Sequence, residues 1–299
     1  MYGLRMPEIL DHPEGQLDLS GWKEVWRCER YESAEQMVSL GWWPAAVVQR
    51  DVAAYEGSHA KIVLRAGTNT ASSFRKRAVF APEHYANGTN PAPTEILVRF
   101  RLRFGEDVGD VDGVKLPGAH GMFENGPFPA GMANLSSYGF SLRTEHTPRD
   151  PKNPRWLGHF TYSYVPGQAG SGSGTPWYTG QDRHFCVRVG SEYEFAQHVR
   201  LNSFAPDGTP NADAIYRLYV NGMLLCERNG IVLRADPRVT SRGLAVGEYL
   251  PRRPHAGDPR CHLLARTGDG VRAGAGFSIR ARAPTRAGAR TYTRTRTAA

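Results

Sequence analysis

Three kinds of feature are scarce in this sequence. No run among its 299 residues approaches the roughly 18 apolar residues of a membrane-spanning helix. The first 15 residues contain no apolar stretch of the kind that a signal peptide carries. Only four cysteines are present, and none has CxxC or other zinc-site spacing. These absences argue against a membrane protein and a zinc module, and they leave either two disulfides or free buried thiols.

Helical periodicity is scarce as well, and only residues 33–40 favour a short helix. The 33 glycines and 21 prolines suit an all-β protein with many turns. Residues 95–104 (EILVRFRLRF) carry apolar side chains at every second position and arginines at three of the others. Because successive side chains of a strand point to opposite faces, this segment predicts a strand with one dry face and one cationic face. The cationic face includes Arg101 and Arg103.

Further short strands follow at regular spacing. Asn221-Gly222 and Asn229-Gly230 are typical of type I′ hairpin turns, and the glycine-rich residues 167–174 suggest a mobile loop over a groove. Many short antiparallel strands predict a jelly-roll β-sandwich of two antiparallel sheets with a concave groove. We expect these additional strands at residues 61–65, 138–143, 159–165, 184–189, 194–201, 214–220, 223–228, 231–234 and 242–249.

The charge is unevenly distributed along the chain. Residues 280–299 contain six arginines and no acid, and without them the net charge falls from +8 to +2. We predict an irregular N-terminal segment (residues 1–20), one β-domain (residues 21–265) and a basic tail without stable structure (residues 266–299). The tail is interpreted either as a solvated end or as an electrostatic tether for polyanions.

Three short patterns within 50 residues combine into one chemical set. The first is residues 115–121 (KLPGAHG), where Lys115 precedes a rigid proline and permissive glycines. This predicts a loop that fixes the lysine at the mouth of a sheet. The second and third are Ser-x-Arg (Ser141 and Arg143) and Tyr-x-Tyr (Tyr162 and Tyr164). Residues two apart in a strand share a face, so neighbouring strands would present all five side chains together.

This set suits β-elimination in a uronic-acid polymer. The proton on C5 is barely acidic while the neighbouring carboxylate is charged, and Lys115 with Arg143 would neutralise that carboxylate. A base must then remove the proton, and an acid must protonate the leaving oxygen. The two cations are expected to lower the pKa of a nearby phenol and make a tyrosinate accessible. Either tyrosine can take either role.

Residues 115–121 resemble the KLPG(L/Y)xGG signature of polysaccharide lyase family 14, glucuronan- and alginate-cleaving enzymes known from chloroviruses and molluscs. The resemblance extends over about residues 20–250 and includes a QxVxLN-like strand ending at Asn202. It implies catalytic roles for Lys115, Ser141, Arg143, Tyr162 and Tyr164 in one groove. His120 stands where the family has a glycine pair, and we interpret it either as a turn residue or as a residue that contacts substrate or assists proton transfer. We also expect Arg101, Arg103 and Asn202 to contact substrate.

Other functions are weighed against the lyase. The same groove would serve a non-catalytic carbohydrate-binding protein, with tryptophans as stacking surfaces (Trp42, Trp43, Trp156 and Trp177). A glycoside hydrolase needs two suitably spaced carboxylates, and acids are sparse between residues 114 and 180. We expect an acidic polysaccharide as the partner, no metal or other cofactor, no membrane or nucleic-acid partner, and a monomer. Localisation stays open; without a signal peptide, we expect such an enzyme to be carried in a virion, to be released by lysis, or to be a fragment of a longer precursor.

Overall fold

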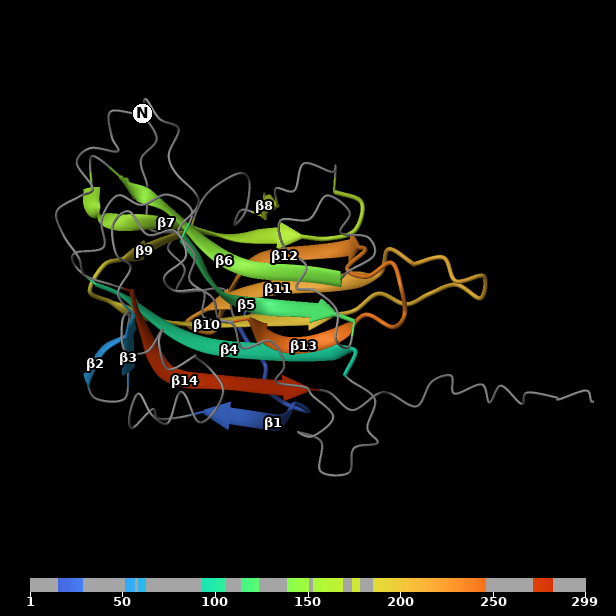
Figure 1. The fold of residues 1–299 in the computed structure, drawn as a ribbon, viewed down its shortest axis with the longest axis horizontal. Helices are drawn as coiled ribbons and strands as arrows, with labels where there is room; N and C mark the ends of the chain where they lie inside the picture. Colours follow the sequence, from blue (N-terminus) through green and yellow to red (C-terminus); the bar gives the residue numbers. More distant parts are fainter. Residues whose placement is uncertain are drawn as a thin grey trace, which may run out of the picture.

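The described part of the chain consists of strands arranged in two antiparallel sheets. The computed structural model describes residues 16–28, 52–56, 59–62, 93–105, 114–123, 139–150, 153–168, 174–177, 185–245 and 271–281. All regular structure within these ranges is β-strand (Figure 1). The predicted fold class is therefore confirmed. The helix expected at residues 33–40 lies outside the described residues, as do Trp42 and Trp43.

The two sheets differ in size. In the larger sheet, seven strands follow the order β12-β11-β10-β4-β14-β3-β2, and β1 pairs with β14. The smaller sheet has the order β13-β5-β6-β7-β8, and β9 pairs with β7. The strands of the larger sheet are β1 (Lys23–Cys28), β2 (Val52–Glu56), β3 (His59–Ile62), β4 (Glu95–Phe104), β10 (Glu192–Arg200), β11 (Ala214–Val220), β12 (Met223–Ile231) and β14 (Val271–Ala281). Those of the smaller sheet are β5 (Val114–Met122), β6 (Gly139–Asp150), β7 (Asn153–Tyr164), β8 (Thr175–Trp177), β9 (Phe185–Arg188) and β13 (Thr240–Ala245).

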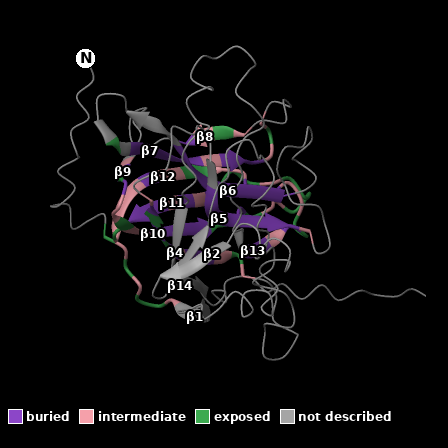
Figure 2. Ribbon diagram, turned by 60° about the vertical axis from the view of Figure 1, so that its left-hand side comes forward, coloured by how far each residue is buried: buried purple, intermediate pink, exposed green. Residues whose placement is uncertain are grey.

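The core lies between the sheets, and β4 follows its predicted alternation. Its apolar positions are fully buried, and Phe100 stacks on Phe195 of β10 at 5.4 Å between ring centroids. Figure 2 shows buried residues along β5, β6, β10 and β11. Leu97, on the other face of β4, is also buried, because Trp22 and neighbouring apolar residues pack against that outer surface. Hydrophobic burial of this kind is the main driving force for folding.

Gln197 of β10 joins the two sheets through its side-chain amide. Its Oε1 accepts a hydrogen bond from the main-chain N–H of Ala119 at 2.6 Å, and its Nε2 donates to the carbonyl oxygen of Leu142 at 2.9 Å. Nε2 also lies 3.1 Å from the hydroxyl of Tyr216, which is 2.6 Å from Oγ1 of Thr161. Buried polar groups are costly unless they are paired, so this network stabilises one alignment of the sheets.

One predicted hairpin is confirmed and the other is wrong. Asn221 and Gly222 both have positive φ (49° and 83°) and connect β11 to β12, as expected for a type I′ turn. Asn229 and Gly230 instead lie within β12. The register of β11 against β12 shifts at this point, so Gly230, with φ of 68°, forms part of a β-bulge.

The C-terminal boundary also differs from the prediction. Strand β14 lies inside the segment expected to lack structure, and it pairs with β4, β3 and β1. The folded part of the chain therefore continues to Ala281. Residues 282–299, which carry most of the tail arginines, lie outside the described residues.

Candidate active site

The segment KLPGAHG lies within strand β5, not in a loop. Strand β5 pairs with β6 on one side and β13 on the other. A register shift between Lys115 and Gly118 places Pro117 in a bulge, where its missing N–H is tolerated. The carbonyl oxygen of Pro117 accepts a hydrogen bond from Oγ1 of Thr144 on β6 at 2.9 Å. The proline thus shapes a kink in the middle of the smaller sheet.

Gly118 allows β5 and β6 to approach closely at this kink. A Cβ added to Gly118 would lie 2.2 Å from the carbonyl oxygen of Leu142, which is main chain and cannot move aside. Gly121 is similarly restricted, because a Cβ there would lie 2.2 Å from the ring of Phe140. Glycine is therefore required at both positions by close packing.

Register brings most of the predicted catalytic residues to one face. His120 pairs with Ser141, which pairs with Tyr164 on β7, and Arg143 pairs with Tyr162. Directly opposed residues of antiparallel strands share a face, and so do residues two apart. The alternate residues face the core, as the contact between Thr161 and the buried Tyr216 of the larger sheet demonstrates. The set therefore lies on the outer face of the smaller sheet, called the site face below.

The site-face residues contact one another and are largely buried. Nε of Arg143 donates to Oγ of Ser141 at 3.2 Å. The rings of Tyr162 and Tyr164 meet edge to face with centroids 5.3 Å apart, and their side chains are hydrogen-bonded. The main-chain N–H of Gly174 donates to the hydroxyl of Tyr162 at 2.9 Å. Tyr162 is half-buried, whereas the other three are buried.

The electrostatics of Tyr164 differ from the expectation. Burial raises the pKa of Tyr164 well above its usual value, and Tyr162 raises it further. Arg143 acts in the opposite direction but does not outweigh burial. The prediction that neighbouring cations lower the phenol pKa is therefore wrong for Tyr164. Its hydroxyl stays protonated at neutral pH, which suits a proton donor.

Lys115 is placed by its backbone alone. It is the register partner of Glu145 on β6, and its side chain lies outside the described part of the structure.

Glu145 itself is a site-face residue that the sequence did not single out. It follows Arg143 by two positions, is 6% exposed, and its carboxylate contributes to the raised pKa of Tyr164. A lone acid in a mixed strand gives no sequence signal of this placement.

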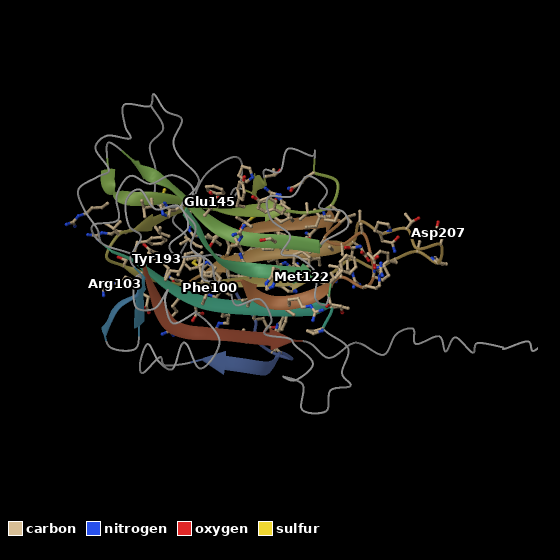
Figure 3. All side chains as sticks on the ribbon, viewed as in Figure 1. Phe100, Arg103, Met122, Glu145, Tyr193 and Asp207 are labelled. Atoms are coloured by element: carbon tan, nitrogen blue, oxygen red, sulfur yellow. The ribbon has the colours of Figure 1, made fainter. Side chains whose placement is uncertain are left out.

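Arg101 and Arg103 do not join this set. Both lie on the outer face of the larger sheet, across the sandwich from Arg143, because they alternate with core residues of β4. Arg101 contacts carboxylates of β10, with nitrogen–oxygen distances of 3.9 Å to Glu192 and 3.6 Å to Glu194. Figure 3 labels Arg103 on the larger sheet and Glu145 on the smaller. Alternation reveals two faces of a strand but not which sheet the strand joins.

Asn202 is a structural residue at the end of β10. It is fully buried, and its Oδ1 accepts hydrogen bonds from the main-chain N–H groups of Leu233 and Arg234 at 3.0 and 2.9 Å. Its Nδ2 donates to the carbonyl oxygen of Arg234 at 3.0 Å. Both ends of the amide are therefore committed to the main chain, and the structure does not bring Asn202 to the site face.

The described residues also give information on metal binding, cysteines and membrane-spanning helices. Within them, no three His, Cys, Asp or Glu side chains gather in a way that would hold a metal ion. Cys226 is a buried free thiol, and Trp177 is buried. No helix in the described ranges has the length and apolar character to cross a membrane.

Comparison with solved structures places this architecture among known folds. No protein-family model matches the sequence, and no curated protein sequence matches it. The structure superposes on the PL-14 alginate lyase of Aplysia kurodai with a TM-score of 0.58 at 17% identity, covering 86% of this chain and 98% of that one. The fold is that of the alginate lyases. Alginate lyase vAL-1 from a Chlorella virus gives a TM-score of 0.55 at 16% identity, covering 89% and 98% of the two chains. A variant of alginate lyase Aly36B in complex with alginate tetrasaccharide gives 0.58 at 13%, covering 87% and 96%.

Proposed function

We propose that this protein is a polysaccharide lyase of the family 14 type, which cleaves a uronic-acid polymer by β-elimination. The observation that carries the proposal is the register of β5, β6 and β7. It aligns Ser141, Arg143, Tyr162 and Tyr164 on one face beside the backbone of Lys115. The alginate lyase fold supports the same conclusion independently of these side chains.

Arg143 and Lys115 neutralise the substrate carboxylate in the proposed reaction. Neutralisation makes the C5 proton acidic enough to remove and stabilises the enediolate that forms. The hydrogen bond from Nε of Arg143 to Oγ of Ser141 fixes the guanidinium orientation. Arginine binds carboxylates in a bidentate manner, which suits this role.

The two tyrosines divide the proton transfers. Tyr162, the more exposed phenol, takes the C5 proton as a phenolate. The electron pair of the C5–H bond becomes the C4–C5 double bond, and the bond from C4 to the glycosidic oxygen breaks. Tyr164, held protonated by burial, donates its proton to that oxygen. The products are one unsaturated uronate end and one new hydroxyl end.

An absorbance assay tests the proposal. Polyglucuronate and alginate are incubated with the protein at neutral to alkaline pH, and the ultraviolet absorbance of the unsaturated end is followed. Lys115→Ala and Arg143→Ala are expected to abolish the signal with an unchanged circular dichroism spectrum. Arg101→Ala is the matched control, since it removes a cation from the opposite outer face and should retain activity.

Absence of product from both polymers would refute lyase activity on them. Retained binding of the same polymers would then favour a non-catalytic carbohydrate-binding protein. Wild-type activity in Arg143→Ala would refute the proposed carboxylate site.

A further inference from the structure

The hydroxyl of Tyr162 is contacted by the main chain just before β8. The N–H of Gly174 donates a hydrogen bond to this hydroxyl at 2.9 Å. Gly174 is the last residue of the glycine-rich segment 167–174, and Pro176 of β8 is the register partner of Tyr162. The start of β8 therefore brings a main-chain donor to a phenol of the site face.

Glycine is required at position 174 for this contact. A Cβ added to Gly174 would lie 2.6 Å from the carbonyl oxygen of Ser163 and 2.6 Å from Cε1 of the Tyr162 ring. Real Cβ atoms are not found at such distances from other heavy atoms. The main chain at Gly174 lies directly against the phenol, and a larger residue would displace the N–H from the hydroxyl.

The side chain of Ser163 fixes the position of this donor. Its Oγ donates to the carbonyl oxygen of Thr175, the residue after Gly174, at 2.8 Å. Nε2 of Gln168 donates to the same Oγ at 3.1 Å, and Oε1 of Gln168 accepts the main-chain N–H of Val165 at 3.1 Å. Ser163 is fully buried, and a satisfied buried network of this kind is rigid. The N–H of Gly174 is therefore held in place without depending on a side-chain rotamer of its own.

A fixed N–H donor suits a base that acts as a phenolate. In the proposed reaction, Tyr162 first loses its own proton to solvent and then takes the C5 proton of the substrate. Tyr164 is also hydrogen-bonded to Tyr162, but it passes its proton to the leaving oxygen. The N–H of Gly174 stays with the Tyr162 oxygen throughout, and a hydrogen bond to a charged oxygen is stronger than one to a neutral oxygen.

We propose that Gly174 is a positioning residue of the reaction, whose main-chain N–H holds Tyr162 in the phenolate form that accepts the C5 proton. The glycine-rich segment thus supplies a group to the site through its backbone. The inference rests on the proposed lyase function and assigns a role to a glycine that no side chain could reveal.

An ester in place of the amide at position 174 tests the donor while keeping the shape of the chain. Glycolic acid, incorporated at position 174 by cell-free translation, replaces the N–H with an oxygen atom. A hydrogen bond to a charged group is worth about 10-fold to 100-fold in an equilibrium constant, so the Tyr162 phenolate should form about one to two pH units higher in the ester. Carbon-13 NMR of protein labelled at tyrosine Cζ measures this ionisation, and Tyr162→Phe assigns the signal.

The pH dependence of kcat gives a second readout. At pH 7, kcat of the ester at position 174 should be lower on the order of 10-fold, because fewer molecules carry the phenolate. As the pH rises, kcat should recover to at least the wild-type value, because a less stabilised phenolate is a stronger base. KM should stay within about twofold of the wild type. A purely structural role of Gly174 would instead lower kcat equally at all pH values.

Two further proteins serve as controls. Glycolic acid at Gly167 makes the same chemical change in the same segment, where the residue is exposed and its N–H makes no hydrogen bond within the described residues. This ester should match the wild type in both readouts. Ser163→Ala removes the hydrogen bond to Thr175 and should move both readouts part of the way towards the ester at position 174.

The outcomes separate this inference from the proposed function. The inference is overturned if Tyr162 ionises at the same pH in the two esters, or if the loss of kcat at position 174 is equal at pH 7 and pH 10. A shift in ionisation without unsaturated product from the wild type would refute the lyase function and leave the contact of Gly174 with the phenolate standing. Product formation with the same ionisation in both esters would refute the role of Gly174 and leave the lyase function standing.

Discussion

His159 makes the stability of this fold sensitive to acid. It lies on β7, fully buried between the sheets, with its ring 4.7 Å from that of Phe195 and 6.5 Å from that of Phe104. Among the described residues, neither of its ring nitrogens has a hydrogen-bond partner. Its register partner His146 is also fully buried. Burial, with a smaller contribution from His146, lowers the pKa of His159 from 6.5 to about 3.

The sign and size of the effect follow from proton binding. The unfolded chain protonates this imidazole below pH 6.5, whereas the folded chain resists protonation until about pH 3. Stability is therefore lost as pH falls through this window, because the unfolded state binds more protons. At about 1.4 kcal/mol per pH unit, the loss is about 2 kcal/mol at pH 5 and about 5 kcal/mol at pH 3. A typical domain is stable by only about 5–15 kcal/mol.

Urea unfolding measures this contribution. The wild type and His159→Leu are unfolded at pH 7 and at pH 5, and tryptophan fluorescence monitors the transition. Leucine fits an apolar site and breaks no hydrogen bond of the ring, so its packing effect should be the same at both pH values. We expect the free energy of unfolding to fall between the two pH values by about 2 kcal/mol more in the wild type. His146→Leu, which removes the second cause of the shift, should reduce the difference in part. Equal losses in wild type and His159→Leu would refute the reasoning.

Three further variants test other parts of the structure. Gln197→Leu leaves the Ala119 N–H and the Leu142 carbonyl without their shared partner, and should lower the free energy of unfolding by about 3 kcal/mol in thermal denaturation; no change would refute the bridge. Asn202→Ala should cost about 3 kcal/mol while leaving oligosaccharide affinity by calorimetry unchanged, and weaker binding would return Asn202 to the substrate contacts. Tyr164→Phe should slow product formation by about 100-fold or more. The pKa of Tyr164 is raised, so loss of its proton should not lower the wild-type rate below about pH 10. A fall in the wild-type rate below that pH that is absent in Tyr164→Phe would contradict this expectation.

The sequence predicted most where a strand carries large apolar residues at every second position. Strand β4 appears with its predicted bounds because Phe100 and its apolar neighbours are separated by arginines. Strand β14 was missed because its sequence, VRAGAGFSIRA, has small residues and glycines where large apolar side chains would reveal the alternation. Its place between β4 and β3 depends on pairing with distant strands, which local pattern does not encode.

The sequence predicted which pairs of side chains share a face of the candidate site, but it predicted neither all the members of that face nor their electrostatics. Residues two apart in a strand necessarily share a face, so Ser141 with Arg143, and Tyr162 with Tyr164, followed from spacing. The raised pKa of Tyr164 depends on burial, and burial depends on what covers the strand. Glu145 stayed unnoticed for the same reason, since an acid becomes informative only when its neighbours across the sheet are known.

The side-chain amide of Gln197 also affects the hydrogen exchange of a main-chain N–H group in the smaller sheet. In an ordinary β-sheet, the hydrogen of a main-chain N–H group can exchange with solvent when two neighbouring strands separate locally. The N–H of Ala119 is instead held by a side chain of the opposite sheet. Its hydrogen exchange requires the sandwich itself to open, so its protection should approach the free energy of global unfolding. Exchange at this one amide beneath the site face therefore measures the free energy needed to separate the two sheets.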